Sequence, residues 1–418
     1  MAIQLSRGLR KYFLQQKALF YGNYRLFLVG QGLSQMGTWI QRIAMMWLAY
    51  TLTKSALLLG LVGFCEQIPI FAIAPFAGVF ADKWDKHKAL IIIDILALVQ
   101  AFVLGILTFT GVVHIVHIVF LSLFLGVVSA FEVPIRQSFV VEMVNLDKAA
   151  LPNAIALNSA MFNLSRLIGP SISGILISIV GEAWCFMANA LSYAIVVVSL
   201  LLMKNLPKSV IIQETGHVFK KLKEGIVYVR QRKVMTNLLL LLAIVSFSNA
   251  SIQTLSPVFA KNVLGGNSRT LGYLLSGTGI GAIMGAIFLT KSKKTSLLRQ
   301  IVSFTGILLG STMICFSMSR WLAVSILFIS FAGLAQMMHT ACTNTLLQSY
   351  VDDDKRGRVM SFYTVCLQGT APFGYLASGT IAKWVGGPIA MATMGAICVI
   401  ATLIFRDPPS RKVNEVTR

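Results

Sequence analysis

The chain has 418 residues, of which 56% are hydrophobic and only 12% are charged, and it carries a formal net charge of +21. Soluble globular chains carry about 25% charged residues, so this composition argues against an ordinary soluble enzyme or binding domain. Apolar runs of about 20 residues, long enough to cross a bilayer, recur from end to end. The sequence therefore predicts an all-α protein with many transmembrane helices.

Twelve apolar spans are expected, at residues 24–50, 57–81, 89–111, 114–133, 153–179, 183–203, 234–258, 270–290, 297–318, 322–347, 359–382 and 388–405. Six spans precede and six follow one long polar stretch, which indicates two six-helix bundles. The expected organisation is a cytoplasmic segment (1–23), an N-terminal bundle (24–203), a linker (204–233), a C-terminal bundle (234–405) and a cytoplasmic tail (406–418).

The basic charge is distributed asymmetrically along these spans. Of the 36 Lys and Arg, 29 fall in the termini, in alternate loops or within the first three residues of the spans that follow them, five fall in the opposite loops, and two lie deep within spans. Cytoplasmic loops carry an excess of Lys and Arg, so this asymmetry places both termini in the cytoplasm. The positive charge is thus explained by topology, and we expect a lipid bilayer rather than nucleic acid as the partner.

The linker contains a basic segment, Val218–Val229, whose apolar residues recur at helical spacing. This pattern predicts an amphipathic helix in the membrane interface, with a solvated charged linker as the alternative. The six Cys all lie in apolar spans without metal-ligand spacing and are interpreted as small core residues. The N-terminal residues contain no apolar segment with a cleavage site, so we expect no cleaved signal peptide.

Three ionisable residues interrupt the apolar spans: Arg42, Glu66 and Arg166. A charge deep in a bilayer costs several kcal/mol or more unless it is paired or faces water, so such residues indicate a polar path through the membrane. Glu66 is the only carboxylate that the expected spans place at depth. Arg42 has a similar expected depth on the preceding span, and an Arg42–Glu66 pair could gain and lose a proton during transport. A static structural ion pair is the alternative.

Polar residues form stripes on four of the spans, because they repeat at three- or four-residue spacing. The first span carries Gln31, Gln35 and Thr38 beside Arg42, and the fifth carries Ser159 and Asn163 beside Arg166. The seventh span carries Asn249, Gln253 and Ser256, and the tenth carries Gln336, His339, Thr340 and Thr343. Such side chains either line a cavity or join helices by hydrogen bonds. His339 could contact a substrate or carry a proton. The alternative is that His339 lies between helices with its hydrogen bonds formed to a neighbouring helix.

The segment Gly78-Val-Phe-Ala-Asp82-Lys83-Trp-Asp-Lys86-His-Lys88 between the second and third spans resembles the loop signature of the major facilitator superfamily. The stretch Ala130–Tyr193 is similar to the branch that contains the enterobactin exporter and related macrolide and multidrug exporters. Asp85 departs from the Gly that the family pattern usually has there. The second copy of the loop, closing the eighth span, lacks the Asp.

The resemblance implies two bundles that rock around a midplane site, which spans one, four, seven and ten line. It implies that Asp82 faces the N-terminus of the eleventh span, where Arg358 could pair with it. It also implies that Lys86 could meet Glu132, with Asp94 and Arg136 close by. Together these residues would latch the bundles on the cytoplasmic side, whereas plain topogenic charge is the alternative.

The segment Arg166-Leu-Ile-Gly169-Pro170-Ser-Ile-Ser173-Gly174 resembles the fifth-span motif of antiporters, with Ser at two of the usual Gly positions. In the family this motif marks exporters, so the direction of transport rests on the resemblance. No nucleotide-binding signature, metal cluster or nucleophile–base pair is visible, and we expect no cofactor, no enzymatic activity and a proton gradient as the energy source.

The sequence thus predicts a proton-coupled exporter of an amphipathic small molecule in the bacterial cytoplasmic (inner) membrane, with no requirement for more than a monomer. The two deep Arg and one deep Glu carry a net positive charge, which favours an anionic cargo such as a siderophore. A multidrug or macrolide pump, a lysolipid flippase and a non-transporting receptor on the same scaffold are the alternatives.

Overall fold

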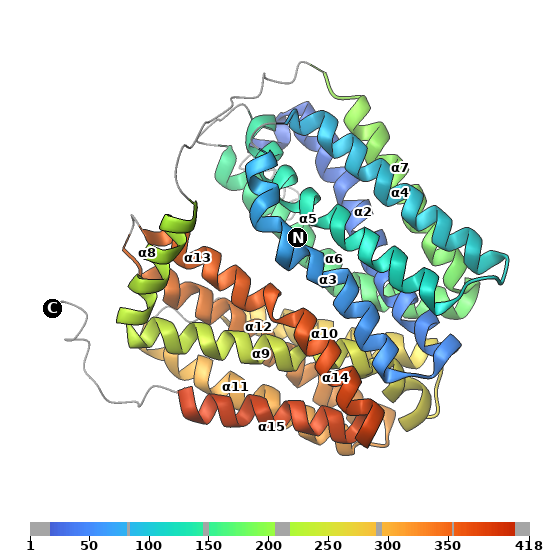
Figure 1. Cartoon of the computed structure of the whole chain (residues 1–418), viewed down its shortest axis with the longest axis vertical. Helices are drawn as coiled ribbons and strands as arrows, with labels where there is room; N and C mark the ends of the chain where they lie inside the picture. The colour runs from blue at the N-terminus through green and yellow to red at the C-terminus, as the bar shows by residue number, and fades with distance from the viewer. Residues whose placement is uncertain are drawn as a thin grey trace, which may run out of the picture. The chain divides into compact units, whose positions relative to one another are not determined.

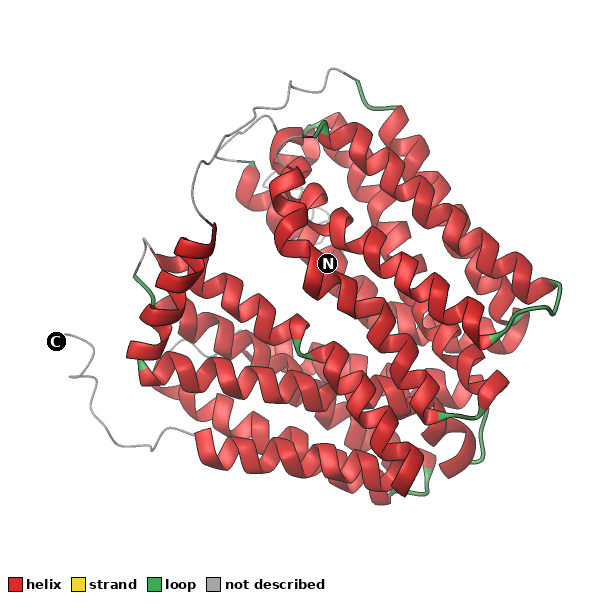
Figure 2. Cartoon of the chain, in the orientation of Figure 1, coloured by secondary structure: helices red, strands yellow, loops and turns green. Residues whose placement is uncertain are grey.

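The computed structural model describes residues 17–81, 84–144, 150–204, 218–289, 295–352 and 355–405. Most of the residues in these ranges are helical, short loops join the helices, and no strand occurs in them (Figure 2). The prediction of an all-α protein is confirmed for this part of the chain.

The first half of the chain forms η1 (Lys17–Phe20), α2 (Gly22–Thr53), α3 (Ala56–Ala81), α4 (Lys86–Phe109), α5 (Ile115–Met143), α6 (Leu151–Val180) and α7 (Glu182–Leu201) (Figure 1). The second half forms α8 (Val218–Gln231), α9 (Lys233–Val258), η2 (Phe259–Val263), α10 (Ser268–Leu289), α11 (Thr295–Met318), α12 (Leu322–Tyr350), α13 (Arg356–Thr364), η4 (Val365–Gly369), α14 (Ala371–Val385) and α15 (Gly387–Phe405). The linker helix predicted over Val218–Val229 is present as α8.

Nine helices within the described ranges are long and apolar enough to cross a membrane, and ten if the bent α6 counts as one span. The expected number of twelve is not confirmed. Polar stripes lower the hydropathy of α2, and the eleventh expected span is divided into α13 and α14 by the π-helical turn η4. In α6 the axis bends by 42° after Pro170, whose ring removes a backbone donor.

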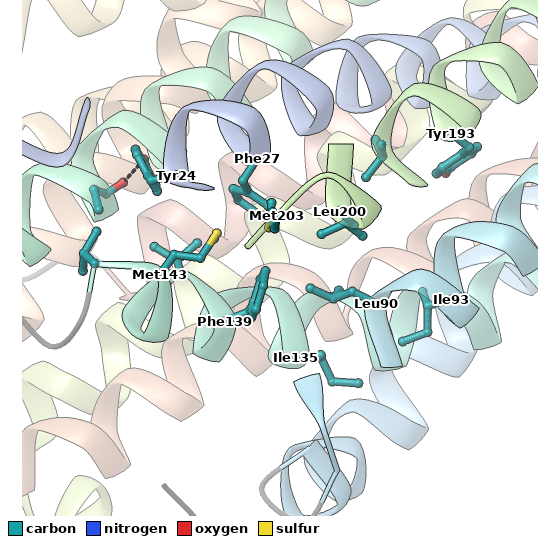
Figure 3. Packing of buried hydrophobic residues seen from close by; sticks show 14 of the residues in the cluster. Tyr24, Phe27, Leu90, Ile93, Ile135, Phe139, Met143, Tyr193, Leu200 and Met203 are labelled. Atoms are coloured by element: carbon teal, nitrogen blue, oxygen red, sulfur yellow. Dashed lines mark hydrogen bonds between the residues drawn. The ribbon is translucent and has the colours of Figure 1, made fainter. Parts of the chain in front are cut away.

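The chain forms two compact units, residues 1–45 with 69–213 and residues 46–68 with 214–418. In the first unit, α4 packs along α5 and α7. Its hydrophobic core includes Tyr24 and Phe27 of α2, Leu90 and Ile93 of α4, and Ile135, Phe139 and Met143 of α5 (Figure 3). Phe27 and Phe139 meet edge to face with ring centroids 6.1 Å apart, and Tyr24 donates a hydrogen bond to the carbonyl of Ala154.

In the second unit, α12 packs along α10 and α11, α15 packs along α11 and α9, and α14 packs along α9. Glycines permit these close approaches. A Cβ on Gly281 of α10 would overlap the carbonyl oxygen of Ser330 on α12, and one on Gly333 of α12 would overlap that of Thr278 on α10. The segment 46–68 belongs to this unit because Gly60 lies against the Tyr375 carbonyl of α14, and Phe64 meets Phe373 edge to face.

The same packing pattern occurs in both units. The third helix of each six packs on the fourth and the sixth: α4 on α5 and α7, and α11 on α12 and α15. The first and fifth helices also meet through a glycine near a proline in each unit, with Gly169 against Trp39 and Gly374 against Phe247. This repetition parallels the two copies of the loop motif in the sequence, one after the second span and one at the end of the eighth.

Candidate functional site

A cluster of charged side chains lies inside the first unit. Asp94 of α4 is 2% exposed and interacts electrostatically with Glu132 and Arg136 of α5. Arg136 Nη1 donates to Glu132 Oε1 over 3.1 Å, one helical turn apart. Asp94 and Glu132 are thus largely buried carboxylates in addition to Glu66. Helix α5 continues to Met143, ten residues beyond the expected end of the fourth span, and so carries both Glu132 and Arg136 within a helix.

Neutral polar groups from α2 and α7 lie beside this cluster. Gln31 donates through Nε2 to Glu132 Oε1 over 3.1 Å. Thr38 donates to the carbonyl of Ser34 over 2.9 Å, so the Tyr193 hydroxyl, 3.0 Å away, donates to Thr38. Tyr193 is almost fully buried. Gln31 and Thr38 thus form hydrogen bonds with other helices of their own unit, as expected if these side chains join helices. Whether they also line a cavity stays a prediction.

The predicted pairing of Lys86 with Glu132 is wrong. Lys86 Nζ lies 2.5 Å from Glu142 Oε1, and both side chains are largely buried. Antiparallel α4 and α5 place the start of one beside the end of the other, whereas Glu132 lies about 15 Å deeper along α5 at 1.5 Å per residue. Asp85, the departure from the family loop, is the N-cap of α4: its side chain accepts from the backbone N–H of Lys88.

Sequence reasoning missed a chain of buried amides that joins four helices. Asn189 Nδ2 donates to Gln41 Oε1 and Gln41 Nε2 donates to Gln100 Oε1, both over 2.8 Å. Gln100 Nε2 donates in turn to the carbonyl of Leu121 over 3.2 Å. All three amides are almost fully buried. Their signal in the sequence is an amide within an apolar span, which cannot be assigned a partner without the fold.

The three deep charges occupy different surroundings. Arg42 of α2 is half-buried, with its guanidinium over the Trp39 ring at 4.7 Å. Arg166 of α6 is exposed. Glu66 of α3 is 3% exposed and lies in the segment 46–68, which belongs to the second unit, whereas Arg42 belongs to the first. An Arg42–Glu66 pair therefore stays a prediction.

The antiporter-like motif of α6 brings this helix close to α2. A Cβ on Gly169 would lie 2.5 Å from Trp39 Cβ, and the Ser173 hydroxyl donates to the carbonyl of Ile40 over 3.1 Å. Pro170 and Gly174 are buried beside them. The side chain of Asn163 on the same helix lies outside the described residues. The motif thus acts as a close helix contact in the first unit.

Polar residues of the second unit lie mainly on α9 and α12. His339 is fully buried, and its Nδ1 lies 3.2 Å from the Val302 carbonyl and 3.3 Å from the Thr305 hydroxyl of α11. Within the described residues, His339 Nε2, Thr343 Oγ1 and Gln336 Oε1 have no hydrogen-bond partner. Gln253 accepts from the Tyr375 hydroxyl over 2.7 Å, and Asn249 is half-buried. Contact of this set with a substrate stays a prediction.

The expected latch is described only in part. Asp82 and Lys83 lie outside the described residues, and Gly78 lies in the helical end of α3, where side-chain surroundings are not described. Arg358, expected to pair with Asp82, donates through Nη1 to Glu224 Oε2 of α8 over 2.7 Å. Latching between the bundles stays a prediction.

Helix α8 is fastened to the second unit by a cluster at the end of α12. The Tyr228 hydroxyl donates to Asp352 Oδ2 over 2.9 Å, and Arg232 pairs with the same carboxylate at 2.9 Å while lying over the Tyr228 ring. Hydrogen bonds from Tyr228 and Arg232 hold the pKa of Asp352 below its usual range. Burial is the main cause that raises the pKa of Tyr228.

These features define a multi-pass helical membrane protein whose helices enclose buried charges and amides. Its fold is that of a membrane transporter. The crystal structure of a bacterial homolog of the human lysosomal transporter Spinster superposes with a TM-score of 0.72 at 14% identity, covering 92% of this chain and 96% of that chain. The chain belongs to the major facilitator superfamily, since residues 18–417 match the family described as transmembrane secretion effector. Members of this family are transporters and not enzymes.

Two characterised relatives extend this likeness over most of the chain. The staphyloferrin A transporter of Staphylococcus aureus is 27% identical over 391 residues, which cover 93% of this chain and 95% of the relative. Macrolide efflux protein A of Streptococcus pyogenes is 22% identical over 381 residues, covering 88% and 92%. The resemblance found in the sequence is confirmed at the level of the superfamily.

Proposed function

We propose that this protein is a proton-coupled exporter of an anionic, amphipathic small molecule of the siderophore class, working by alternating access in the bacterial cytoplasmic membrane. The observation that carries the proposal is the similarity to a staphyloferrin A transporter over 93% of the chain. The antiporter-like motif at Gly169 and Pro170 supports export, and the basic loops support cytoplasmic termini.

The chemistry of the deep residues supports an anionic cargo. Arg42 and Arg166 together with Glu66 carry a net charge of about +1. A guanidinium can bind a carboxylate through two parallel hydrogen bonds. These guanidinium groups could therefore bind the carboxylates of a chelator, whereas a neutral or cationic drug has no carboxylate for them to bind.

Metabolite profiling of the culture medium under iron limitation tests the substrate class. Cells that contain the protein should release a carboxylate chelator that cells without it retain. If both strains release equal amounts and the presence of the protein changes erythromycin resistance, the siderophore proposal is refuted and a macrolide or multidrug efflux pump is supported instead.

That alternative is a macrolide or multidrug efflux pump, which the similarity to macrolide efflux protein A favours. A lysolipid flippase is a weaker candidate, and release of lysolipid from spheroplasts would support it. A non-transporting receptor would show no substrate flux in any of these assays.

Proton coupling is tested in inverted membrane vesicles with iron-free staphyloferrin A as the probe. An imposed pH gradient should drive its uptake. If Glu66 is the coupling residue, Glu66→Gln should abolish this uptake while probe binding remains. Uptake retained in the Glu66→Gln variant would exclude Glu66 as the proton carrier.

A further inference from the structure

Two carboxylates and one guanidinium share a buried site in the first unit. Asp94, Glu132 and Arg136 interact across α4 and α5, and the site carries one net negative charge when both acids are ionised. Asp94 lies about 12 Å along α4 from Lys86, and Glu132 lies about 16 Å from the end of α5, at 1.5 Å per residue. A buried carboxylate without a compensating cation is strongly disfavoured, and one guanidinium compensates only one of them.

Other charged and polar groups lie on the helices around the site. From α4 itself, Lys86 is paired with Glu142 of α5. From α7, the Tyr193 hydroxyl donates to Thr38. From α2, Gln31 contributes a neutral amide, and Arg42, whose guanidinium lies over the Trp39 ring, is a further cation in the surroundings.

A second observation shows that this cluster is incomplete. Arg136 is 6% exposed, and its Nε has no hydrogen-bond partner among the described residues, although Nη1 of the same guanidinium bonds Glu132. Buried polar groups in folded proteins nearly always have a partner, and a functional role is one explanation for an exception. A guanidinium with one unused donor can follow a carboxylate whose charge changes.

We propose that Asp94 and Glu132 form the proton-carrying site of the transporter, holding one shared proton beside Arg136 in one state and releasing it in the other. Binding adds a proton from water to a carboxylate oxygen and makes the site neutral; release returns that proton to water and restores one negative charge. The inference rests on the proposed proton coupling and assigns it to residues other than Glu66.

Infrared titration of the purified full-length protein tests the site without any substrate. In a maltoside detergent, which has no C=O group, a protonated carboxylic acid shows its own C=O stretching band. Above about pH 6 exposed carboxyls are ionised, so a band that persists there reports a buried acid. Wild type should show this band, and Asp94→Asn and Glu132→Gln should each lose it.

Two matched variants make the assignment specific. Glu142→Gln removes an ion-paired carboxyl from the same helix, and Glu66→Gln removes the rival candidate; both should keep the band. Absence of the band in wild type, its persistence in both site variants, or its loss in Glu66→Gln would overturn the proposal. If an amide variant does not fold, Asp94→Glu keeps the acid and should shift the titration midpoint of the band, whereas an unchanged midpoint counts against the site.

Vesicle transport of iron-free staphyloferrin A then separates this inference from the proposed function. Asp94→Asn should lose uptake driven by a pH gradient but keep exchange of labelled for unlabelled probe, because exchange requires no net proton movement. Gradient-driven uptake retained in this variant overturns the inference. No uptake by wild type would refute the substrate proposal alone, since the infrared result stands without it.

Discussion

The two compact units bury polar groups in different ways. In the first unit, buried side chains bond from helix to helix: Gln41 reaches α4, Asn189 reaches α2, and Lys86 reaches α5. In the second unit, most buried hydroxyls bond back to their own helix, as Ser251 does to Ser248 and Thr254 to Ala250. Its helices instead approach through glycine. The first unit thus has more buried side-chain bonds between helices, and the second has more contacts in which a glycine faces backbone atoms. The two units should therefore respond differently to substitution.

The largest effect is expected where two backbones touch. Gly281→Val places side-chain atoms against the Ser330 carbonyl, so α10 and α12 must separate, at a cost of roughly 3 kcal/mol or more. Thermal unfolding of the purified protein, followed by size-exclusion chromatography, should show a clear fall in Tm. Gly357→Ala is the control, because a Cβ there meets nothing within 4 Å. Equal Tm values for both variants would show that glycine packing does not stabilise the second unit.

The buried ion pair of the first unit should have the next largest effect. Lys86→Met leaves the Glu142 carboxylate without its cation in a poorly solvated place, at a cost of about 3 kcal/mol. The same unfolding measurement on Lys88→Met provides the control, because its pair with Asp85 spans 3.8 Å between side chains that are 79% and 54% exposed. That exposed pair contributes about 0–1 kcal/mol. A double variant, Lys86→Met with Glu142→Leu, should recover most of the loss.

The amide chain offers a direct comparison between the units. Asn189→Leu removes the donor to Gln41 and leaves a buried acceptor unpaired, which costs about 1–3 kcal/mol. Ser251→Ala in the second unit removes a hydroxyl that bonds its own helix, so its cost should be smaller. Urea unfolding of both variants measures the difference. A larger loss for Ser251→Ala would contradict the contrast between polar and glycine-mediated packing.

The smallest effect is expected at the surface cluster that fastens α8. The pKa of Asp352 is lowered in the folded state, so its contribution is present above the ordinary value of about 3.9 and is lost as the pH falls through the folded value. Deuterium exchange of the α8 amides should therefore be slow at pH 7 and faster, after correction for intrinsic rates, below about pH 4. Asp352→Asn should show the faster exchange already at pH 7. Equal exchange rates in wild type and the Asp352→Asn variant at pH 7 would show that the Asp352 carboxylate does not hold α8 in place.

The helical class, the superfamily and the linker helix were predictable, because they depend on hydropathy and on local motifs. The charged site was predicted less well. Asp94, Glu132 and Arg136 were expected to lie close together, but as part of a surface latch, because hydropathy alone ended the fourth span before Arg136. Lys86 meets Glu142 because of how α4 and α5 are aligned along each other. This alignment depends on packing, which the sequence pattern does not give. The roles of Gln41 and Gln100 depend on contacts between distant segments, and an amide within an apolar span does not by itself indicate its partner.

The amide chain has one consequence for how the first unit responds to acidity. Amide side chains do not ionise, so the bonds that tie Gln41, Gln100 and Asn189 together have the same strength in acid and in alkali. A few turns away, Asp94 and Glu132 can change charge. On the proposed assignment, the unit combines amide hydrogen bonds that do not depend on pH with two carboxyls that do, so protonation of the carboxyls would occur beside helices that stay tied together.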